Sequence, residues 1–487
     1  MWVATGGGSG MCIGGEAVRG PALAASLTLV LWITTVPALL PYAQAQAPAP
    51  SEFTALPLPV GSGARALGQG GAFVAVADDA TAGVWNPAGL SQLERPEVSI
   101  VGTHLATRQR FDDAQNAEGP DTVTSVDFGA DEGEARFDLN FLSVTYPTRV
   151  WGRNLVVSLN YHQRYDFHQR LRFSTASTVA GPLPTDVNQK FDFRAEGGIG
   201  VLSPAVAVEV TPRLSLGLAV NLLRNEFLGD DAYTQDLRLA TEQRIDLGLP
   251  PPVGTGSTRY TDHTVVDFSG TSTTLGVMWR AWQHRGSVLT LAAAVETQFT
   301  ADVDRATRVT RYDQVQDGMP IPDEAAETKS RLRVDFPLSA TVGAALRLSD
   351  CTTIALDLGW TQWSEWVQED QETGQRTRPI GGASADADVD DLFTARLGME
   401  HVLSVAAGKV PLRAGLFYDP RPGLGNEQSI YGLSLGSGFT TPRFSLDAAY
   451  QYHTGDDLLG RNISANLLDT SFEVEEHLFI ASLITYF

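Results

Sequence analysis

The 487-residue chain has little charge, almost no cysteine and few long apolar runs. Only 19% of its residues are charged, 2 are cysteine and three are lysine (Lys190, Lys329 and Lys409). Two cysteines exclude a disulfide scaffold. The 57 acidic residues outnumber the 35 basic ones, and the resulting charge of −22 excludes a nucleic-acid surface, which needs clustered Lys and Arg. A 43% apolar share and 9 Trp exclude a wholly disordered chain.

The one long apolar run covers residues 22–40. Arg19 precedes it and an A-x-A pattern, Ala43-Gln44-Ala45, follows it. This arrangement predicts a secretory signal peptide over residues 1–45, cleaved near Ala45. An uncleaved membrane anchor is the alternative, because a spanning helix needs about 20 residues, but Pro37 and the small residues favour cleavage. Residues 46–60, rich in Ala, Pro and Gln, are predicted to form an extended periplasmic lead-in.

The rest of the chain alternates apolar and polar residues with a period of two. Leu214, Leu216 and Leu218 alternate with Ser215 and Gly217, for example. Such alternation is typical of transmembrane β-strands, whose two faces average to an unremarkable mean hydropathy, here −0.07. We therefore predict an all-β fold, a closed antiparallel transmembrane β-barrel of about fourteen strands over residues 97–487. The expected strands are 97–108, 136–148, 152–164, 197–210, 213–228, 264–281, 286–301, 331–349, 352–367, 389–403, 410–420, 427–441, 443–454 and 472–487.

The connections between these segments alternate in length. Short turns alternate with long polar stretches near 109–135, 165–196, 229–263, 302–330 and 368–388, as expected for periplasmic turns and extracellular loops. The long stretches contain many acids, which predicts that much of the −22 lies outside the cell. Solvated loops explain these acids, and divalent cations linking them to lipopolysaccharide are the alternative. We expect a bacterial outer-membrane, multi-pass location, with membrane lipid and lipopolysaccharide as partners.

Three patterns invite an enzymatic interpretation, and none has the required context. Gly61-x-Gly63-x-x-Ala66 fits a loose dinucleotide fingerprint but follows no strand. The segment 432–436 has the G-x-S-x-G pattern around Ser434, yet it lies inside a predicted strand. The eight His are dispersed, without the spacing of a zinc site. We therefore expect no catalysis, no metal and no cofactor.

Residues 61–96 combine glycine with apolar side chains that require burial. Five glycines lie between Gly61 and Gly71, which indicates a tightly turned backbone. Phe73 and Trp85 nearby need to be covered. Such a segment could form a periplasmic cap or a plug inside the lumen, and the plug satisfies both requirements because the wall covers the side chains and pairs the backbone.

Several blocks resemble the FadL/TodX outer-membrane transport family. They are GARALGQGGAFVAVADDATAGVWNPAGL (63–90), SPAVAVEVTPRLSLGLAVN (203–221), FPLSATVGAALRLSDCTTIALDLGWTQWSEW (336–366), PLRAGLFYDPRP (411–422), FSLDAAYQYH (444–453) and SFEVEEHLFIASLITYF (471–487). The chain also ends on Phe487, which resembles the signature read by the barrel assembly machinery, although Thr485 stands where Tyr is commoner.

The resemblance implies a fourteen-stranded barrel, a hatch over residues 61–96 inside the lumen, and uptake of long-chain fatty acids or aromatic and aliphatic hydrocarbons. It implies that ligand binds, the hatch moves and the ligand leaves sideways through the wall. The hatch residues carried over are Trp85, Asn86, Pro87, Ala88 and Gly89.

The strand pattern also predicts a group of polar side chains that face the lumen. They are Asn221, Glu296, Arg347, Asp357, Arg396, Glu400, Arg413 and Asp447. We expect an ion-paired network that holds the hatch, and the alternative is that Arg396 and Arg413 together bind a substrate carboxylate. The acidic loops disfavour the approach of an anion and so favour a neutral hydrocarbon.

The function expected from the sequence is therefore uptake of hydrophobic small molecules by a monomer. The first alternative is a secretion-system-associated shuttle barrel with the same hatch signature. The second is an outer-membrane lipase that uses Ser434.

Overall fold

The computed structural model describes most of the chain beyond the predicted signal peptide. It covers residues 58–59, 61–111, 116–119, 122–127, 132–179, 184–225, 233–245, 255–379, 384–423, 429–456 and 472–487. The predicted signal peptide and most of the predicted lead-in lie outside the described residues. In the part that is described, no helix is both long enough and apolar enough to cross a bilayer.

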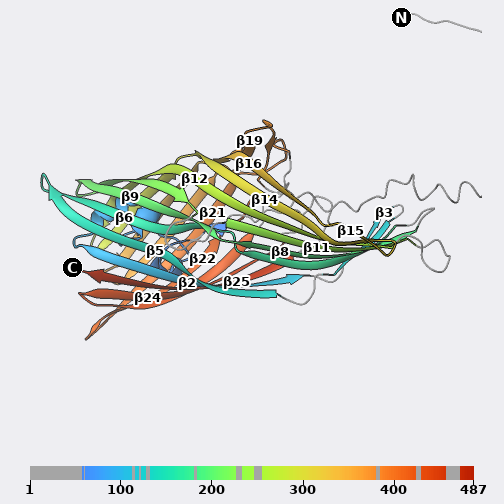
Figure 1. The fold of residues 1–487 in the computed structure, drawn as a ribbon. Helices are drawn as coiled ribbons and strands as arrows, with labels where there is room; N and C mark the ends of the chain where they lie inside the picture. Colours follow the sequence, from blue (N-terminus) through green and yellow to red (C-terminus); the bar gives the residue numbers. More distant parts are fainter. Residues whose placement is uncertain are drawn as a thin grey trace, which may run out of the picture. The chain divides into compact units, whose positions relative to one another are not determined.

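The described residues form the closed antiparallel barrel of fourteen strands that the sequence predicts (Figure 1). Each strand pairs with the next, and the last pairs with the first, so that the sheet closes on itself. The barrel strands are β2 (Glu97–Phe111), β5 (Glu132–Val150), β6 (Arg153–Asp166), β9 (Gly198–Thr211), β10 (Leu214–Arg224), β12 (Thr255–His284), β13 (Ser287–Glu296), β17 (Ser339–Ser349), β18 (Thr352–Thr361), β21 (Leu392–Val405), β22 (Gly408–Tyr418), β23 (Ile430–Thr440), β24 (Phe444–Asp456) and β25 (Phe472–Tyr486).

The alternation of side chains along β18 shows why these segments form a membrane barrel. Ala355 and Asp357 point inward and are buried, whereas Leu356 and Leu358 point outward and are 45% and 50% exposed. Large exposed apolar side chains recur on the outward faces of most barrel strands, for example Leu216, Leu275 and Leu433. A continuous apolar outer surface of this kind is stable only against lipid.

One end of the barrel carries tight turns. Trp151-Gly152 and Arg285-Gly286 each have positive φ at both central positions, which is the two-residue turn that matches the twist of a hairpin. Phe487 lies at the same end, where its amide donates a hydrogen bond to the Pro96 carbonyl. We assign this end to the periplasm because outer-membrane barrels have their short turns there.

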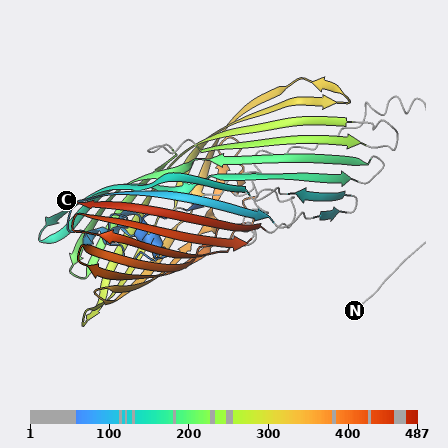
Figure 2. The same cartoon turned by 90° about the horizontal axis from the view of Figure 1, so that it is seen from below.

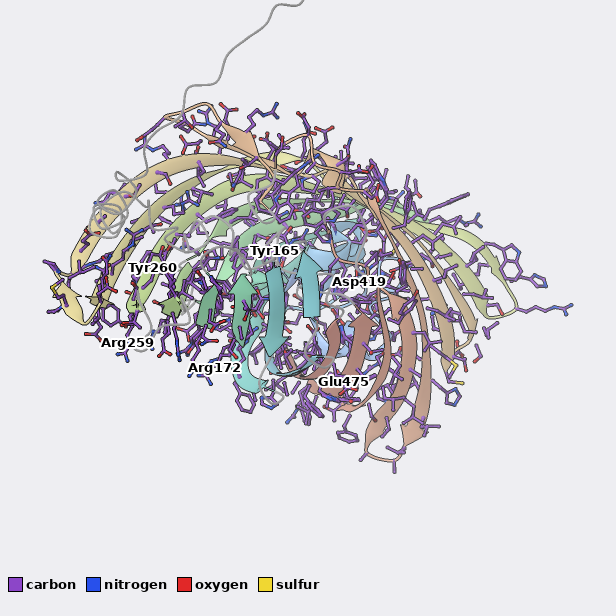
Figure 3. The ribbon with its side chains drawn as sticks, turned by 90° about the vertical axis from the view of Figure 1, so that its right-hand side faces the viewer. Tyr165, Arg172, Arg259, Tyr260, Asp419 and Glu475 are labelled. Carbon is purple, nitrogen blue, oxygen red and sulfur yellow. The ribbon has the colours of Figure 1, made fainter. Side chains whose placement is uncertain are left out.

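At the other end, one side of the barrel wall continues into a further sheet (Figure 2). The strands of this extension pair in the order β3, β4, β7, β8, β11, β12, β14, β16, β19 and β20, so that β12 belongs to both the barrel and the extension. Its other strands are β3 (Asn116–Gly119), β4 (Thr122–Asp127), β7 (Gln169–Val179), β8 (Thr185–Glu196), β11 (Tyr233–Ile245), β14 (Phe299–Gln316), β16 (Glu324–Phe336), β19 (Val367–Asp370) and β20 (Arg376–Thr377), with β15 (Met319–Ile321) beside β14 and the 3-10 turn η4 (Trp363–Glu365) before β19. Figure 3 looks at this end, and Arg259 lies on the extension.

The extension corrects the prediction of long polar loops, because its strands lie in all five of these stretches: 109–135, 165–196, 229–263, 302–330 and 368–388. Strand β8 shows the reason for the error. Phe191 and Phe193 are buried on its inner face, but Asp192 and Arg194 on its outer face make the segment as polar as a loop. Sequence averages over such a strand favour a loop, because its outer face meets water instead of lipid.

The end of the predicted periplasmic lead-in also differs from expectation. Leu58 and Pro59 form a short strand, β1 (Leu58–Pro59), which pairs with Asp166 and Tyr165 at the extracellular end of β6. These two residues therefore lie against the barrel wall and not in the periplasm.

The lipid-facing role of Leu356 gives a stability prediction. We expect Leu356→Arg to lower the free energy of unfolding in lipid vesicles by about 2–4 kcal/mol, because it places a charge near the middle of the apolar band. Urea unfolding followed by tryptophan fluorescence measures this change. Thr353→Arg, on the lumen-facing side of the same strand, is the control, and an equal loss in both variants would contradict the assignment of faces.

Candidate functional site

The segment 61–96, which we call the hatch, lies inside the barrel and contains little regular structure. Its helical turns are α2 (Ala64–Gly68), α3 (Ala82–Trp85) and the 3-10 turn η3 (Pro87–Gln92). Helix α2 packs against β22 to β25, and η3 packs against β6, β9, β10 and β12 on the opposite side. Phe73 and Leu90 have no exposed surface. The apolar side chains of the hatch are therefore buried against the inner face of the wall.

Backbone groups of the hatch bond to polar side chains of the wall. The Asp357 carboxylate on β18 accepts hydrogen bonds from the backbone N–H groups of Phe73 and Val74, at 2.7 and 2.8 Å. The Asn86 amide group donates to the Val74 carbonyl at 2.9 Å and to the Val277 carbonyl on β12 at 3.2 Å. Asn86 therefore joins two parts of the hatch to the wall.

Ser434, the serine of the G-x-S-x-G pattern, is another wall side chain that bonds to the hatch backbone. Its hydroxyl is buried and donates to the Gly68 carbonyl at 3.1 Å. Nearby, the Gln451 side chain donates to the Leu67 carbonyl at 2.8 Å, and the Ser482 hydroxyl accepts from the Ala64 N–H at 2.7 Å. Ser434 is thus one of three wall side chains that pair the backbone of α2, which is a structural role.

Glycines on the wall allow the hatch to approach this closely. A Cβ atom on Gly217 would lie 2.2 Å from the Ala88 nitrogen, and one on Gly276 would lie 2.1 Å from Asn86 Oδ1. On the other side of the lumen, a Cβ atom on Gly415 would lie 2.3 Å from the Gln69 carbonyl carbon. The wall therefore has glycine where the hatch backbone contacts it.

The remaining candidate hatch residues lie around Asn86. Pro87, Ala88 and Gly89 are buried in η3. The Trp85 indole N–H donates to the Ser62 carbonyl at 2.8 Å, and the ring packs edge-on to Phe73 with centroids 6.3 Å apart. The motif thus holds the hatch together as well as docking it.

Glu400, Arg413 and Asp447 form an ion-paired cluster below the hatch. Arg413 bonds to Glu400 at 2.7 Å and to Asp447 at 2.5 Å, and its side chain is only 3% exposed. From the hatch, Arg65 reaches Glu400 at 3.1 Å and also pairs with Asp78. These residues line a cavity of about 400 Å³ that faces the periplasmic end.

The neighbouring hatch residue Asp79 is buried. Burial raises the pKa of its carboxyl, and the nearby Arg65 guanidinium opposes that rise. The Thr81 hydroxyl donates to Asp79 Oδ1 at 2.5 Å. Asp79 therefore adds a second acid to the hatch side of the cluster.

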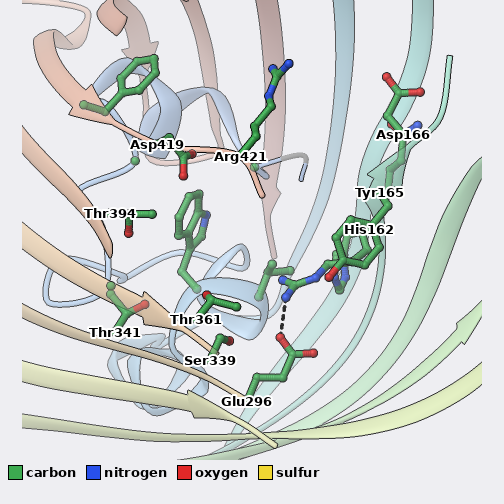
Figure 4. A pocket seen from close by; sticks show the side chains of 18 of the residues that line it. His162, Tyr165, Asp166, Glu296, Ser339, Thr341, Thr361, Thr394, Asp419 and Arg421 are labelled. Atoms are coloured by element: carbon green, nitrogen blue, oxygen red, sulfur yellow. Dashed lines mark hydrogen bonds and ion pairs between the residues drawn. The ribbon is translucent and has the colours of Figure 1, made fainter. Parts of the chain in front are cut away.

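Asn221 and Glu296 belong to a second polar group, above the hatch. The Asn221 amide donates to the Thr274 hydroxyl at 2.9 Å and to the Ser272 hydroxyl at 3.1 Å. Ser272 donates to Glu296 at 2.7 Å, and Arg164 pairs with Glu296 at 2.5 Å (Figure 4).

Arg396 and Arg347 lie apart from both groups. Arg396 pairs with Asp419 at 2.9 Å and stands 5.8 Å from the centre of the Trp85 ring. Arg347 is exposed near the periplasmic end of β17, and within the described residues it forms no ion pair. Since Arg413 is already bonded to two carboxylates, the arrangement does not favour a clamp made of Arg396 and Arg413.

A cavity of about 310 Å³ lies between the hatch and the extracellular part of the wall. Aromatic side chains line part of it, including Trp85, Phe299, Phe336, Trp363 and Phe417. Phe299 and Phe336 stack with centroids 4.9 Å apart. Tyr165 and Asp419, which also line the cavity, are labelled near the centre of Figure 3.

Every arginine that lines this cavity is paired with a carboxylate. Besides the pairs of Arg164 and Arg396, Arg136 bonds to Asp138 at 2.6 Å and pairs with Asp166, and Arg421 bonds to Glu476 at 2.8 Å. The cavity is therefore lined by aromatic as well as polar side chains, and its positive charges are already compensated. Across the described ranges, no three His, Cys, Asp or Glu side chains gather as metal ligands would.

Comparison with known proteins identifies the family. The family described as outer membrane protein transport protein (OMPP1/FadL/TodX) matches residues 43–477. The chain belongs to this family. Its members are outer-membrane transporters of hydrophobic compounds, which agrees with the fold, the apolar outer surface and the cavity. No curated protein sequence matches the chain.

Solved structures of the family share the fold at low sequence identity. A FadL homologue of Pseudomonas aeruginosa superposes with a TM-score of 0.57 at 16% identity, covering 88% of this chain and 99% of the homologue. The toluene transporter TodX of P. putida gives 0.53 at 13% identity, covering 88% and 99%. The monoaromatic hydrocarbon channel CymD gives 0.51 at 14% identity, covering 88% and 98%.

Sequence reasoning missed the arginines that complete the two polar groups. An ion-paired role for Arg65 could have been predicted, because Arg65 is the one cation between Gly61 and Leu93 and the same segment contains Asp78 and Asp79. Arg164 gave no signal, because it lies near the end of β6, where the sequence pattern does not show which of its polar side chains face the lumen.

The cluster around Arg413 gives a second stability prediction. We expect Arg413→Met to destabilise this FadL/TodX-family barrel by about 3–5 kcal/mol, because it leaves Glu400 and Asp447 buried without their shared cation. Denaturant unfolding in lipid vesicles measures the change. Arg347→Met is the matched control, since an exposed arginine without an ion pair should cost no more than about 0.5 kcal/mol. Equal stability of both variants would show that the cluster does not hold the structure.

Proposed function

We propose that this chain takes up hydrophobic small molecules across the outer membrane. In this proposal the ligand enters from the extracellular end, binds in the cavity above the hatch, and leaves sideways into the bilayer after the hatch moves. The observation that carries the proposal is the 310 Å³ cavity between hatch and wall, with its aromatic lining and compensated arginines. An apolar ligand gains about 25 cal/mol for each Å² that it removes from water in such a site.

The wall contains a seam that supports a sideways exit. Pairing between β5 and β6 ends at Phe141 and His162. Beyond this point β5 continues to pair with β2, while β6 pairs with β9 and, on its open edge, with the two residues of β1. The cavity lining includes residues on both sides of the seam, among them Asp138 on β5 and Gln163 on β6.

The outer surface beside the seam is apolar. Phe137 on β5 is 83% exposed and stacks on His104 of β2 with ring centroids 4.2 Å apart. Leu159 on β6 is 51% exposed. A ligand that leaves between β5 and β6 would therefore meet an apolar surface and lipid, where its burial remains favourable.

The first test measures uptake directly. We expect cells without the gene to take up labelled toluene or labelled oleate several-fold more slowly at low concentration, and the plasmid-borne gene to restore the rate. Proteoliposomes that contain the protein should not swell in arabinose or sucrose, because the hatch fills the lumen. Swelling like that of a general porin, or unchanged uptake of both compounds in the deletion strain, would contradict the proposal. Unchanged uptake together with co-purification of a secretion complex would favour the shuttle-type barrel.

The second test asks whether the hatch must move. A Cβ atom on Gly68 would lie 3.5 Å from the Ala449 Cβ on β24, which is within disulfide range. In a Cys351→Ser background, we expect oxidised Gly68→Cys/Ala449→Cys protein to transport at less than about a tenth of its reduced rate, because the disulfide fixes α2 to the wall. The reduced form of the same protein and the two single-cysteine variants are the controls. Equal transport by the oxidised and reduced forms would show that this part of the hatch stays in place.

A further inference from the structure

Four hydroxyl side chains gather on one side of the cavity above the hatch. They are Ser339 and Thr341 on β17, Thr361 on β18 and Thr394 on β21, which are three neighbouring strands of the wall. Figure 4 shows them on the side of the cavity away from His162 and Asp166. All four are partly exposed to the cavity.

The strand register brings these hydroxyls together. Ser339 is the direct cross-strand partner of Thr361, and Gly359 is the direct partner of both Thr341 and Thr394. A Cβ atom on Gly359 would lie 2.4 Å from Thr394 Oγ1 and 3.3 Å from Thr341 Oγ1, so both hydroxyls lean over the glycine. The glycine thus leaves room for a hydroxyl pair where any other residue would place its own side chain.

Within the described residues, none of these four hydroxyls bonds to another protein group. This sets them apart from the hydroxyls of Ser272 and Ser434, which bond to Glu296 and to the Gly68 carbonyl. A hydroxyl can both donate and accept a hydrogen bond. The four groups are therefore available to a ligand that enters the cavity.

The nearby charge excludes a carboxylate as the group that binds here. Arg396, two residues after Thr394 on β21, is the cation next to the patch, and it already bonds to Asp419 at 2.9 Å. The other arginines of the cavity are paired as well. A ligand carboxylate would therefore be partly buried without a cation of its own, which is costly.

The rest of the cavity lining beside the patch is aromatic. Phe336 precedes Ser339 by three residues and stacks with Phe299, and Trp363 follows Thr361 by two. These rings would contact the apolar body of a ligand whose polar group reaches the hydroxyls.

We infer that the cavity selects a neutral, oxygenated apolar molecule, such as a phenol, an alcohol or a ketone, whose oxygen bonds to the Thr341 and Thr394 hydroxyls. This inference rests on the proposed uptake function and specifies its substrate class. A site that offers such hydrogen bonds discriminates against an analogue without the polar group, because the protein hydroxyls then lose their water and gain no partner.

The test compares three ligands that share the ethylbenzene skeleton and differ in the polar group attached to it. Binding of 4-ethylphenol, ethylbenzene and 4-ethylbenzoate to the purified full chain is measured by isothermal titration calorimetry. We expect 4-ethylphenol to bind about threefold to tenfold more tightly than ethylbenzene, the range that one neutral hydrogen bond provides, and 4-ethylbenzoate to bind most weakly. In Thr341→Val/Thr394→Val the preference for 4-ethylphenol should disappear while ethylbenzene binds as before. Thr353→Val, on β18 outside the cavity, should retain the preference.

Each other outcome overturns the inference. Equal binding of 4-ethylphenol and ethylbenzene to the unchanged protein would refute the role of the hydroxyls and leave uptake of hydrocarbons standing. Tightest binding of 4-ethylbenzoate would show an anion site. A preference that survives in the double variant, or that Thr353→Val also removes, would show that these two hydroxyls do not make it. Binding of none of the three ligands would overturn the inference and also count against the proposed function.

Discussion

The hatch has little regular secondary structure, so its backbone polar groups must find partners on the wall. A backbone N–H or carbonyl group that is buried inside a barrel cannot bond to bulk water instead, and leaving it unpaired costs about 1–3 kcal/mol. Asp357, Ser434 and Gln451 supply such partners from separate strands, and glycines such as Gly217 and Gly276 let the backbone approach. All of these contacts require the same position of the hatch. A small displacement of the hatch would therefore weaken several hydrogen bonds at once. The hatch movement that we propose would therefore break several of these contacts together.

The same requirement shapes the charges in the lumen. Arg413 is enclosed by Glu400 and Asp447 below the hatch, and Arg164 is paired with Glu296 above it. Each of these two ion-paired groups joins different strands, so it holds the wall together as well as neutralising buried charge. What remains beside the hatch is a cavity whose arginines are compensated, and that is a poor site for an anion. The chain, with its charge of −22, thus has a cavity in which every arginine among the described residues is already paired with a carboxylate.

The fold could be predicted from the sequence further than the site could. The period of two identified the fourteen barrel strands, because lipid on one side and a filled lumen on the other force every strand to alternate. The same signal failed for β8, where Asp192 and Arg194 face water and hide the buried Phe191 and Phe193. The polar lumen residues were identifiable by their position on strands, yet their partners were not. Glu400 and Arg65 are separated by 335 residues in the chain, and only closure of the barrel around the hatch brings them together.

Release of the ligand places an upper limit on how tightly the cavity can bind it. Both the cavity and the bilayer remove an apolar ligand from water, so most of the hydrophobic free energy is the same in the two places and contributes little to direction. Hydrogen bonds to Thr341 and Thr394 would be lost on exit, which makes them useful for discrimination but limits how many a transporter can use. The ligand must also be able to leave through the wall at low cost, and the seam between β5 and β6 would allow this. Beyond His162, the edge of β6 that faces β5 is paired only with Leu58 and Pro59 among the described residues, so opening it breaks far fewer backbone hydrogen bonds than separating two full strands. In the mechanism that we propose, a cavity of moderate affinity beside this seam would allow net inward movement whenever the ligand is diluted or consumed on the inner side.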